Sequence, residues 1–97
     1  MRLHDFINST TGIYPDSKLF VSFEKNLIPL THLVITNDYL SLQSIPQHTT
    51  LTLSQFILKT KQLPINYRIT FQNNLTSELI NLWGYRIVQE NHQLILH

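Results

Sequence analysis

Cysteine is absent from the 97-residue chain, and glycine occurs only twice. Without cysteine the chain has no disulfide scaffold, no thiolate metal site and no cysteine nucleophile. Two glycines are too few for the glycine-rich loops that hold phosphates, and neither the dinucleotide-binding pattern nor the Walker A pattern occurs. The sequence therefore gives no reason to expect a nucleotide or redox cofactor.

Charge is also scarce, because only 13% of the residues are charged and the net charge is +1. Such a balance supports neither a strongly cationic nucleic-acid-binding protein nor an acidic protein that mimics nucleic acid. Ser, Thr, Asn and Gln number 32, so we expect a largely neutral, hydrogen-bonding surface. No apolar run is long enough to cross a membrane, and the first ten residues lack a signal-peptide core. These features predict a cytoplasmic protein without membrane contact.

Apolar residues are plentiful, since Ile, Leu, Val and Phe account for 35 of the 97 positions. That share is far above the composition typical of disorder and predicts a packed core. The length suits one domain, residues 1–97, and is too short for two ordinary ones.

Hydrophobic periodicity predicts an α+β fold with short helices on a mostly antiparallel sheet. Helical spacing occurs at Leu3, Phe6 and Ile7 and again at Leu53, Phe56 and Ile57, where Thr52 and Gln55 have the spacing of a capping box. Leu75, Leu79, Leu82 and Trp83 predict a third helix. Strands are expected over 18–24, 33–36, 39–43, 67–72, 85–90 and 93–96. Asn37-Asp38 and Asn91-His92 indicate hairpin turns, and Pro29 indicates an edge strand or an irregular segment.

The two halves of the chain resemble each other, with a first repeat over about 1–43, a connector over 44–50 and a second repeat over about 51–97. LFVSFEKNL, residues 19–27, aligns with YRITFQNNL, residues 67–75, if two residues are deleted between helix and strand. This pattern indicates either a duplication or two halves that follow the same helix-then-sheet order by chance. In both cases each half alone is marginal, so we expect the halves to share one core.

No catalytic, metal or cofactor-binding constellation emerges from the sequence. The five histidines are scattered, and none belongs to a known metal-binding pattern. His4-Asp5 is a poor dyad, because adjacent helical residues do not face each other. We therefore predict a protein that is not an enzyme, and a small enzyme built around a histidine is the weakest hypothesis.

The preferred hypothesis is a small accessory protein that acts through protein–protein contacts. The absence of alanine and the wealth of Ile, Leu and Asn suggest an AT-rich genome, and hence a bacterial, phage or mobile-element origin. The alternative is a nucleic-acid-associated factor, in which basic and aromatic residues of the second half bind a strand. The candidate residues for either contact are Lys59, Lys61, Arg68, Trp83, Tyr85 and Arg86.

The last strand predicts self-association. Leu94, Ile95 and Leu96 are three consecutive apolar residues, so a strand there presents apolar side chains on both faces. Either the third helix covers the second face, or a second copy of the chain does. We predict a homodimer through Leu94, Ile95 and Leu96.

Overall fold

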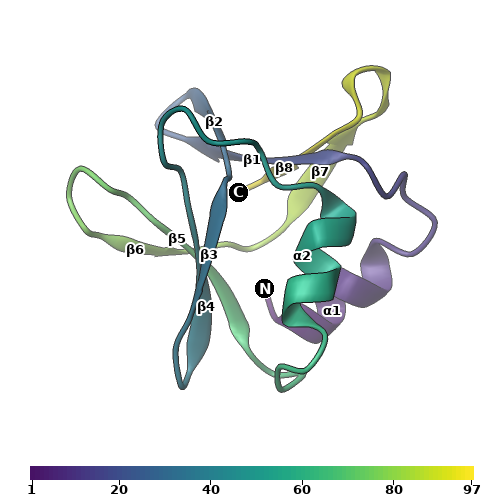
Figure 1. Ribbon diagram of the computed structural model, residues 1–97, viewed down its shortest axis with the longest axis horizontal. Coiled ribbons are helices and arrows are strands. Elements are labelled where there is room, and N and C mark those ends of the chain that lie inside the picture. Colours follow the sequence, from purple (N-terminus) through teal and green to yellow (C-terminus); the bar gives the residue numbers. More distant parts are fainter.

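The computed structural model describes residues 1–97 as an α+β arrangement of two short helices and two four-stranded sheets. Each half of the chain supplies one helix followed by four strands (Figure 1). The first half contains α1 (Leu3–Ser9), β1 (Lys18–Phe23), β2 (Asn26–Pro29), β3 (His32–Ile35) and β4 (Tyr39–Gln43). The second half contains α2 (Leu53–Thr60), β5 (Arg68–Gln72), β6 (Leu79–Asn81), β7 (Tyr85–Val88), the 3₁₀ turn η1 (Gln89–Asn91) and β8 (Gln93–Leu96).

Both sheets are built from one hairpin of each half. Their strand orders are β2-β1-β8-β7 and β3-β4-β5-β6, with antiparallel outer pairs. The two central pairs, β1 with β8 and β4 with β5, are parallel. Hairpins can only be antiparallel, so a parallel pair must join segments separated by a crossover connection. Neither half therefore has a complete sheet of its own.

The two helices are anchored by backbone hydrogen bonds that occur in matching pairs. In each pair, the residue numbers of one bond differ from those of the other by 50. The pairs are Leu3 N to Tyr67 O (2.7 Å) with Leu53 N to Ser17 O (2.8 Å), and Ile69 N to Met1 O (3.0 Å) with Leu19 N to Leu51 O (2.9 Å). Leu19 thus corresponds to Ile69, so the two-residue deletion in the sequence alignment is wrong. The hypothesis of a gene duplication stays a prediction.

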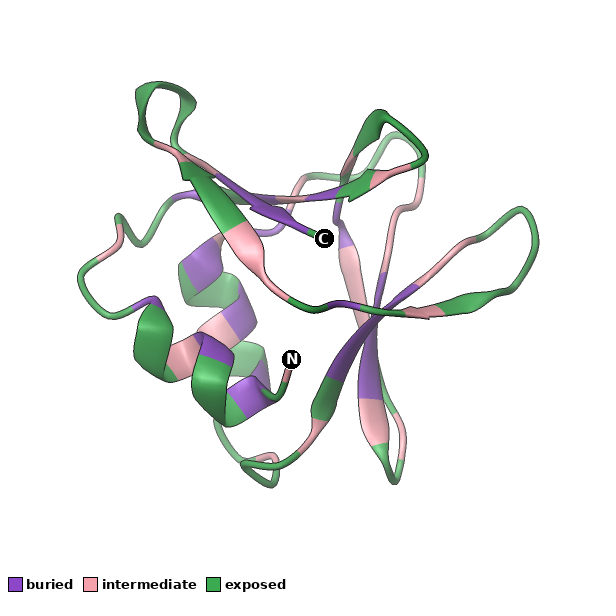
Figure 2. Ribbon diagram, turned by 180° about the vertical axis from the view of Figure 1, so that it is seen from behind, coloured by how far each residue is buried: buried purple, intermediate pink, exposed green.

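The core lies between the two sheets and the inward sides of the helices, as the buried residues in Figure 2 show. It contains 15 side chains, of which seven come from residues 1–43 and eight from residues 51–97. Phe6 of α1 and Phe56 of α2 meet edge to face at its centre, with ring centroids 5.2 Å apart. The expected shared core is thus present, with Phe71 buried and Phe23 only partly so.

Several local signals in the sequence are confirmed. The Thr52 hydroxyl accepts a hydrogen bond from Gln55 N, and the Gln55 side chain accepts one from Thr52 N, so the capping box is complete. β3 and β4 form a hairpin around Asn37-Asp38, and Pro29 ends an edge strand. His92 takes a left-handed conformation in the last hairpin, at φ 52°. Neither helix is long and apolar enough to cross a membrane.

The predicted third helix is wrong. Residues 73–78 form a turn, in which the Asn73 side chain accepts a hydrogen bond from Leu75 N (3.0 Å) and Ser77 has a φ of 59°. β6 follows and pairs with β5. Of the four apolar residues with this spacing, Leu75, Leu79 and Trp83 are exposed and only Leu82 is buried, so they do not form one core-facing helical stripe. Asn, Thr and Ser side chains offer the backbone turn hydrogen bonds that compete with a helix, and β5 gains an edge partner here.

Candidate functional site

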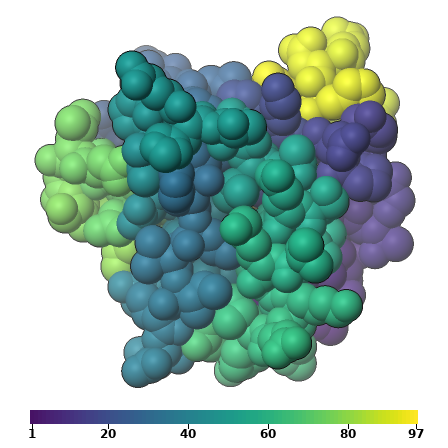
Figure 3. All heavy atoms as spheres, viewed as in Figure 1, coloured from purple at the N-terminus to yellow at the C-terminus, as the bar shows by residue number.

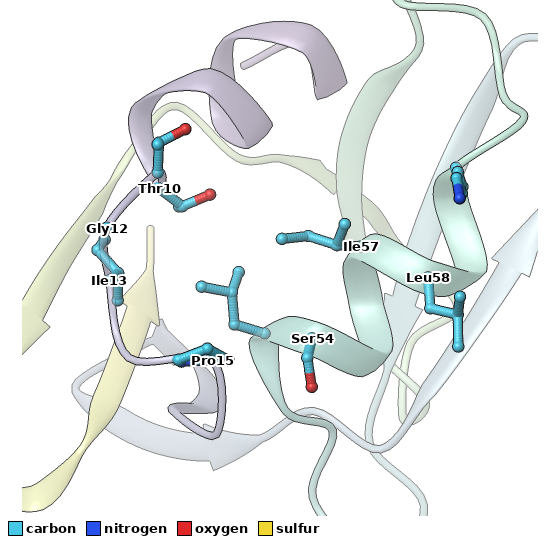
Figure 4. Close-up of a pocket in the computed structure, with 10 residues that line it drawn as sticks. Thr10, Gly12, Ile13, Pro15, Ser54, Ile57 and Leu58 are labelled. Carbon is cyan, nitrogen blue, oxygen red and sulfur yellow. The ribbon is translucent and has the colours of Figure 1, made fainter.

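One hollow lies between α2 and the segment that follows α1, and we call it the helix hollow. Its volume is about 440 Å³. Figure 4 shows Ile57 pointing from α2 toward the segment that carries Thr10, Gly12 and Ile13. Gly12 has a φ of 89°, and this left-handed conformation turns the chain out of α1 toward Pro15. The lining residues are Thr10, Thr11, Gly12, Ile13, Pro15, Leu53, Ser54, Ile57, Leu58 and Lys61.

The helix hollow exposes several apolar side chains. Leu58 is 72% exposed, and Ile13 and Ile57 are partly exposed. α2 is amphipathic, with Leu53 and Phe56 buried in the core, so Leu58 lies outside its core-facing stripe. A smaller hollow of about 150 Å³ lies between Ile7, Leu63 and their neighbours, beside Ile65, which is 66% exposed. The helices and their flanking segments therefore expose large apolar side chains that are not needed to fill the core.

The six contact residues predicted from the sequence do not converge. Lys59 and Lys61 are exposed on and just after α2, and Lys61 lines both helix-side hollows. Tyr85 points inward, since its ring lies 5.4 Å from that of Phe6 and its hydroxyl hydrogen-bonds Ser9 Oγ (2.9 Å). Arg86 is exposed on β7, opposite Ile95.

Only Arg68 and Trp83 come together, and Arg2 joins them. These three residues line one hollow of about 380 Å³, and Arg2 and Arg68 also line a neighbouring hollow of about 540 Å³. Arg2 was missed by sequence reasoning, which gave it no role. The signal that identifies it is its place opposite Arg68 in a backbone bridge, and no local pattern in the sequence carries that information.

The predicted dimer residues are enclosed within the chain. β8 lies between β1 and β7, so it has no free edge. Leu94 and Leu96 belong to the core and are 0% exposed, and Ile95 on the other face is 2% exposed. Both faces of β8 are therefore covered within the single chain, without a third helix. A dimer therefore finds no exposed surface at Leu94, Ile95 or Leu96, and the oligomeric state itself stays a prediction.

The histidines are dispersed over the surface. The His32 and His48 rings meet edge to face at 4.7 Å, and His92 lies against Tyr14 at 4.5 Å. His4 is within hydrogen-bond distance of the Asn8 amide (3.0 Å). No group of three or more His, Asp and Glu side chains is arranged to hold a metal ion.

Comparison with protein families, with characterised proteins and with solved structures finds no significant match. The function must therefore be argued from the geometry of this chain.

Proposed function

We propose that the chain is a non-enzymatic binding protein that docks a protein partner in the helix hollow. The observation that carries this proposal is Leu58, which is 72% exposed beside an apolar hollow of about 440 Å³. Large exposed apolar side chains that adjoin a hollow are typical of interaction surfaces. The space can accept one or two apolar side chains of a partner.

A protein partner suits the hollow better than a small molecule does. Small-molecule sites enclose most of the ligand and place a few converging polar groups around it. Here the polar groups in the wall are the Ser54 and Thr hydroxyls and the Lys61 ammonium, and Leu58 lies on the open side. An apolar anchor inserted beside an exposed leucine, with a polar rim around it, is the usual arrangement of a binding hot spot.

The region around α2 is also sterically accessible. In the space-filling view of Figure 3, α2 lies on the face toward the reader, while the β5–β6 and β7–β8 turns project at the edges. A partner can therefore approach the helix without meeting either turn. Since the contact is apolar, we expect its affinity to change little with salt.

The test compares two leucine variants of the intact protein. Leu58→Asp places a charge at the rim of the helix hollow, and Leu75→Asp makes the same change at a residue that is 95% exposed in a distant turn. Each tagged variant captures proteins from an extract of the source cells, and the captured partner is then purified and titrated. We expect Leu58→Asp to weaken binding at least tenfold and Leu75→Asp to bind like the parent. Equal affinity of both variants would overturn the proposal.

A further inference from the structure

We propose that Arg2, Arg68 and Trp83 form a binding site for a nucleotide unit, in which the phosphate lies on the two guanidiniums and the base stacks on the indole. We call these three residues the arginine–tryptophan site. It lies away from the helix hollow, with which it shares no residue. The proposal is therefore independent of the protein-docking function.

The two arginines emerge side by side from the backbone. Arg2 and Arg68 face each other in an antiparallel bridge, and opposed residues in such a pair have Cβ atoms about 5 Å apart. Their backbones are fixed on both sides by the Leu3 N to Tyr67 O and Ile69 N to Met1 O hydrogen bonds. Like charges held directly opposite each other are destabilising. The backbone thus holds two positively charged residues opposite each other, and an anion bound between them would relieve their repulsion.

No protein group neutralises this pair directly. Both arginines are exposed, and the structure contains no ion pair. Asp5 lines the hollow that contains Trp83, and Asp38 lines the neighbouring hollow. The hollow that contains Trp83 is lined by two guanidiniums and one carboxylate, so the site suits one phosphodiester or one terminal phosphate rather than a polyphosphate. Arginine forks bind phosphate oxygens in pairs, which makes them well adapted to such a group.

Trp83 supplies the second half of the site. It is the only tryptophan in the chain and is 78% exposed, yet its backbone is held by a hydrogen bond from its N to His97 O (2.6 Å). An exposed indole with a fixed backbone provides a stacking surface, and a base stacked on an aromatic ring gains about 1–3 kcal/mol. The Asn81 amide lines the same hollow and can hydrogen-bond the edge of a base.

The corresponding place on the other half shows that the fold does not require these residues. There Thr52 stands opposite Lys18, so the arginine pair is replaced by one hydroxyl and one ammonium. Thr31 takes the place of Trp83, since its N donates to Gln43 O as Trp83 N donates to His97 O. Thr31 is only 7% exposed, and its hydroxyl accepts a hydrogen bond from Ile45 N. Equivalent backbone positions thus hold different residues in the two halves. At one place they hold Lys18 together with Thr52, which caps α2, and Thr31, which is packed inside. At the other they hold the exposed residues Arg2, Arg68 and Trp83.

Trp83 fluorescence tests the site directly, because no other tryptophan contributes to the signal. The full chain is titrated with three probes, namely inorganic phosphate, adenosine monophosphate and an eight-residue single-stranded oligonucleotide. We expect saturable quenching by the two probes that carry bases and none by phosphate alone. A tighter response to the oligonucleotide assigns the site to a strand, whereas equal responses assign it to a free nucleotide. Absence of quenching up to millimolar concentrations of all three probes would overturn the proposal.

Three substitutions connect the signal to the residues. Arg2→Gln and Arg68→Gln should each weaken binding about tenfold or more, because each removes a charge-assisted contact. Arg86→Gln is the matched control, since Arg86 is exposed and lines neither hollow, and it should change affinity less than twofold. For one or two phosphate contacts, affinity for the oligonucleotide should fall about three- to sevenfold between 50 and 200 mM salt. Parent-like affinity of Arg68→Gln, with its melting temperature unchanged, would refute the assignment.

Discussion

Cutting the chain in the connector should leave two fragments that cannot fold separately but fold together. The cut between His48 and Thr49 falls in an exposed segment without regular structure. It breaks no strand, yet it separates β1 from β8 and β4 from β5, the central pairs of both sheets. Each fragment keeps one helix and two hairpins, and isolated hairpins are at best marginally stable in water.

The size of the effect follows from how the core is divided. Seven of its 15 side chains belong to the first fragment and eight to the second. At about 1.5–3 kcal/mol for each buried side chain, exposing one set removes about 10–24 kcal/mol. Even if a fragment kept half of this burial, the loss of about 5–12 kcal/mol would match the stability of an entire domain of this length, about 5–15 kcal/mol.

Circular dichroism and proton–nitrogen NMR of the two fragments decide the question. Each fragment alone should give the narrow amide dispersion of an unfolded chain. An equimolar mixture at tens of micromolar should recover the spectrum of the intact protein, because both parallel pairs form between fragments. A dispersed spectrum from either fragment alone would refute the shared core, and unchanged spectra after mixing would contradict the observed strand pairing.

Four substitutions test the packing more locally, each by urea or thermal unfolding. Thr52→Ala removes the capping hydroxyl of α2 and should cost about 1 kcal/mol; an unchanged unfolding midpoint would show that the capping box does not stabilise the helix. Phe71→Ala should cost about 3–5 kcal/mol, and Phe23→Ala less, because Phe23 is only partly buried; equal losses would place both rings in the same environment. Ile95→Lys puts an ammonium where the side chain is 2% exposed and should lower the melting temperature strongly; a variant as stable as the parent would mean that this face of β8 is open.

The elements that the sequence predicts correctly are those governed by local signals. The Thr52 and Gln55 spacing identifies the start of α2, and the alternation from Lys18 to Glu24 identifies β1, which ends at Phe23. The third helix fails because the spacing from Leu75 to Trp83 fits a helix, while the side-chain hydrogen bonds of Asn73 and Thr76 favour a turn. Local spacing carries no information about whether a core is present to receive the helical face.

The pairing of strands from different halves could not be predicted from the sequence for a different reason. Periodicity places Ile95 in a strand, but it does not say which strands lie beside β8, so the apolar run was interpreted as a dimer contact. The same limit hid the candidate nucleotide site. Arg2 and Arg68 are far apart in the chain, and only the bridge between the segment before α1 and β5 brings them together.

The arginine–tryptophan site makes a prediction about stability as well as binding. Arg2 is the N-cap of α1 and makes no side-chain capping bond, although its backbone angles of −91° and 152° are close to the −93° and 164° of Thr52, which caps α2. The backbone is therefore already arranged for a capping residue. A functional side chain kept at such a position is expected to lower stability.

Arg2→Thr should consequently stabilise the fold while it weakens nucleotide binding. The new hydroxyl can accept a hydrogen bond from Asp5 N, which is worth about 0.5–1 kcal/mol, and the repulsion with Arg68 is removed. Arg2→Ala is the control, because it removes the same charge without adding a cap. We expect urea unfolding to rank Arg2→Thr above both Arg2→Ala and the parent, and the fluorescence titration to show an equal loss of binding in both variants. If Arg2→Thr were less stable than Arg2→Ala, position 2 would not be a vacant capping position. If instead it bound the oligonucleotide as tightly as the parent, the guanidinium of Arg2 would have no part in the site.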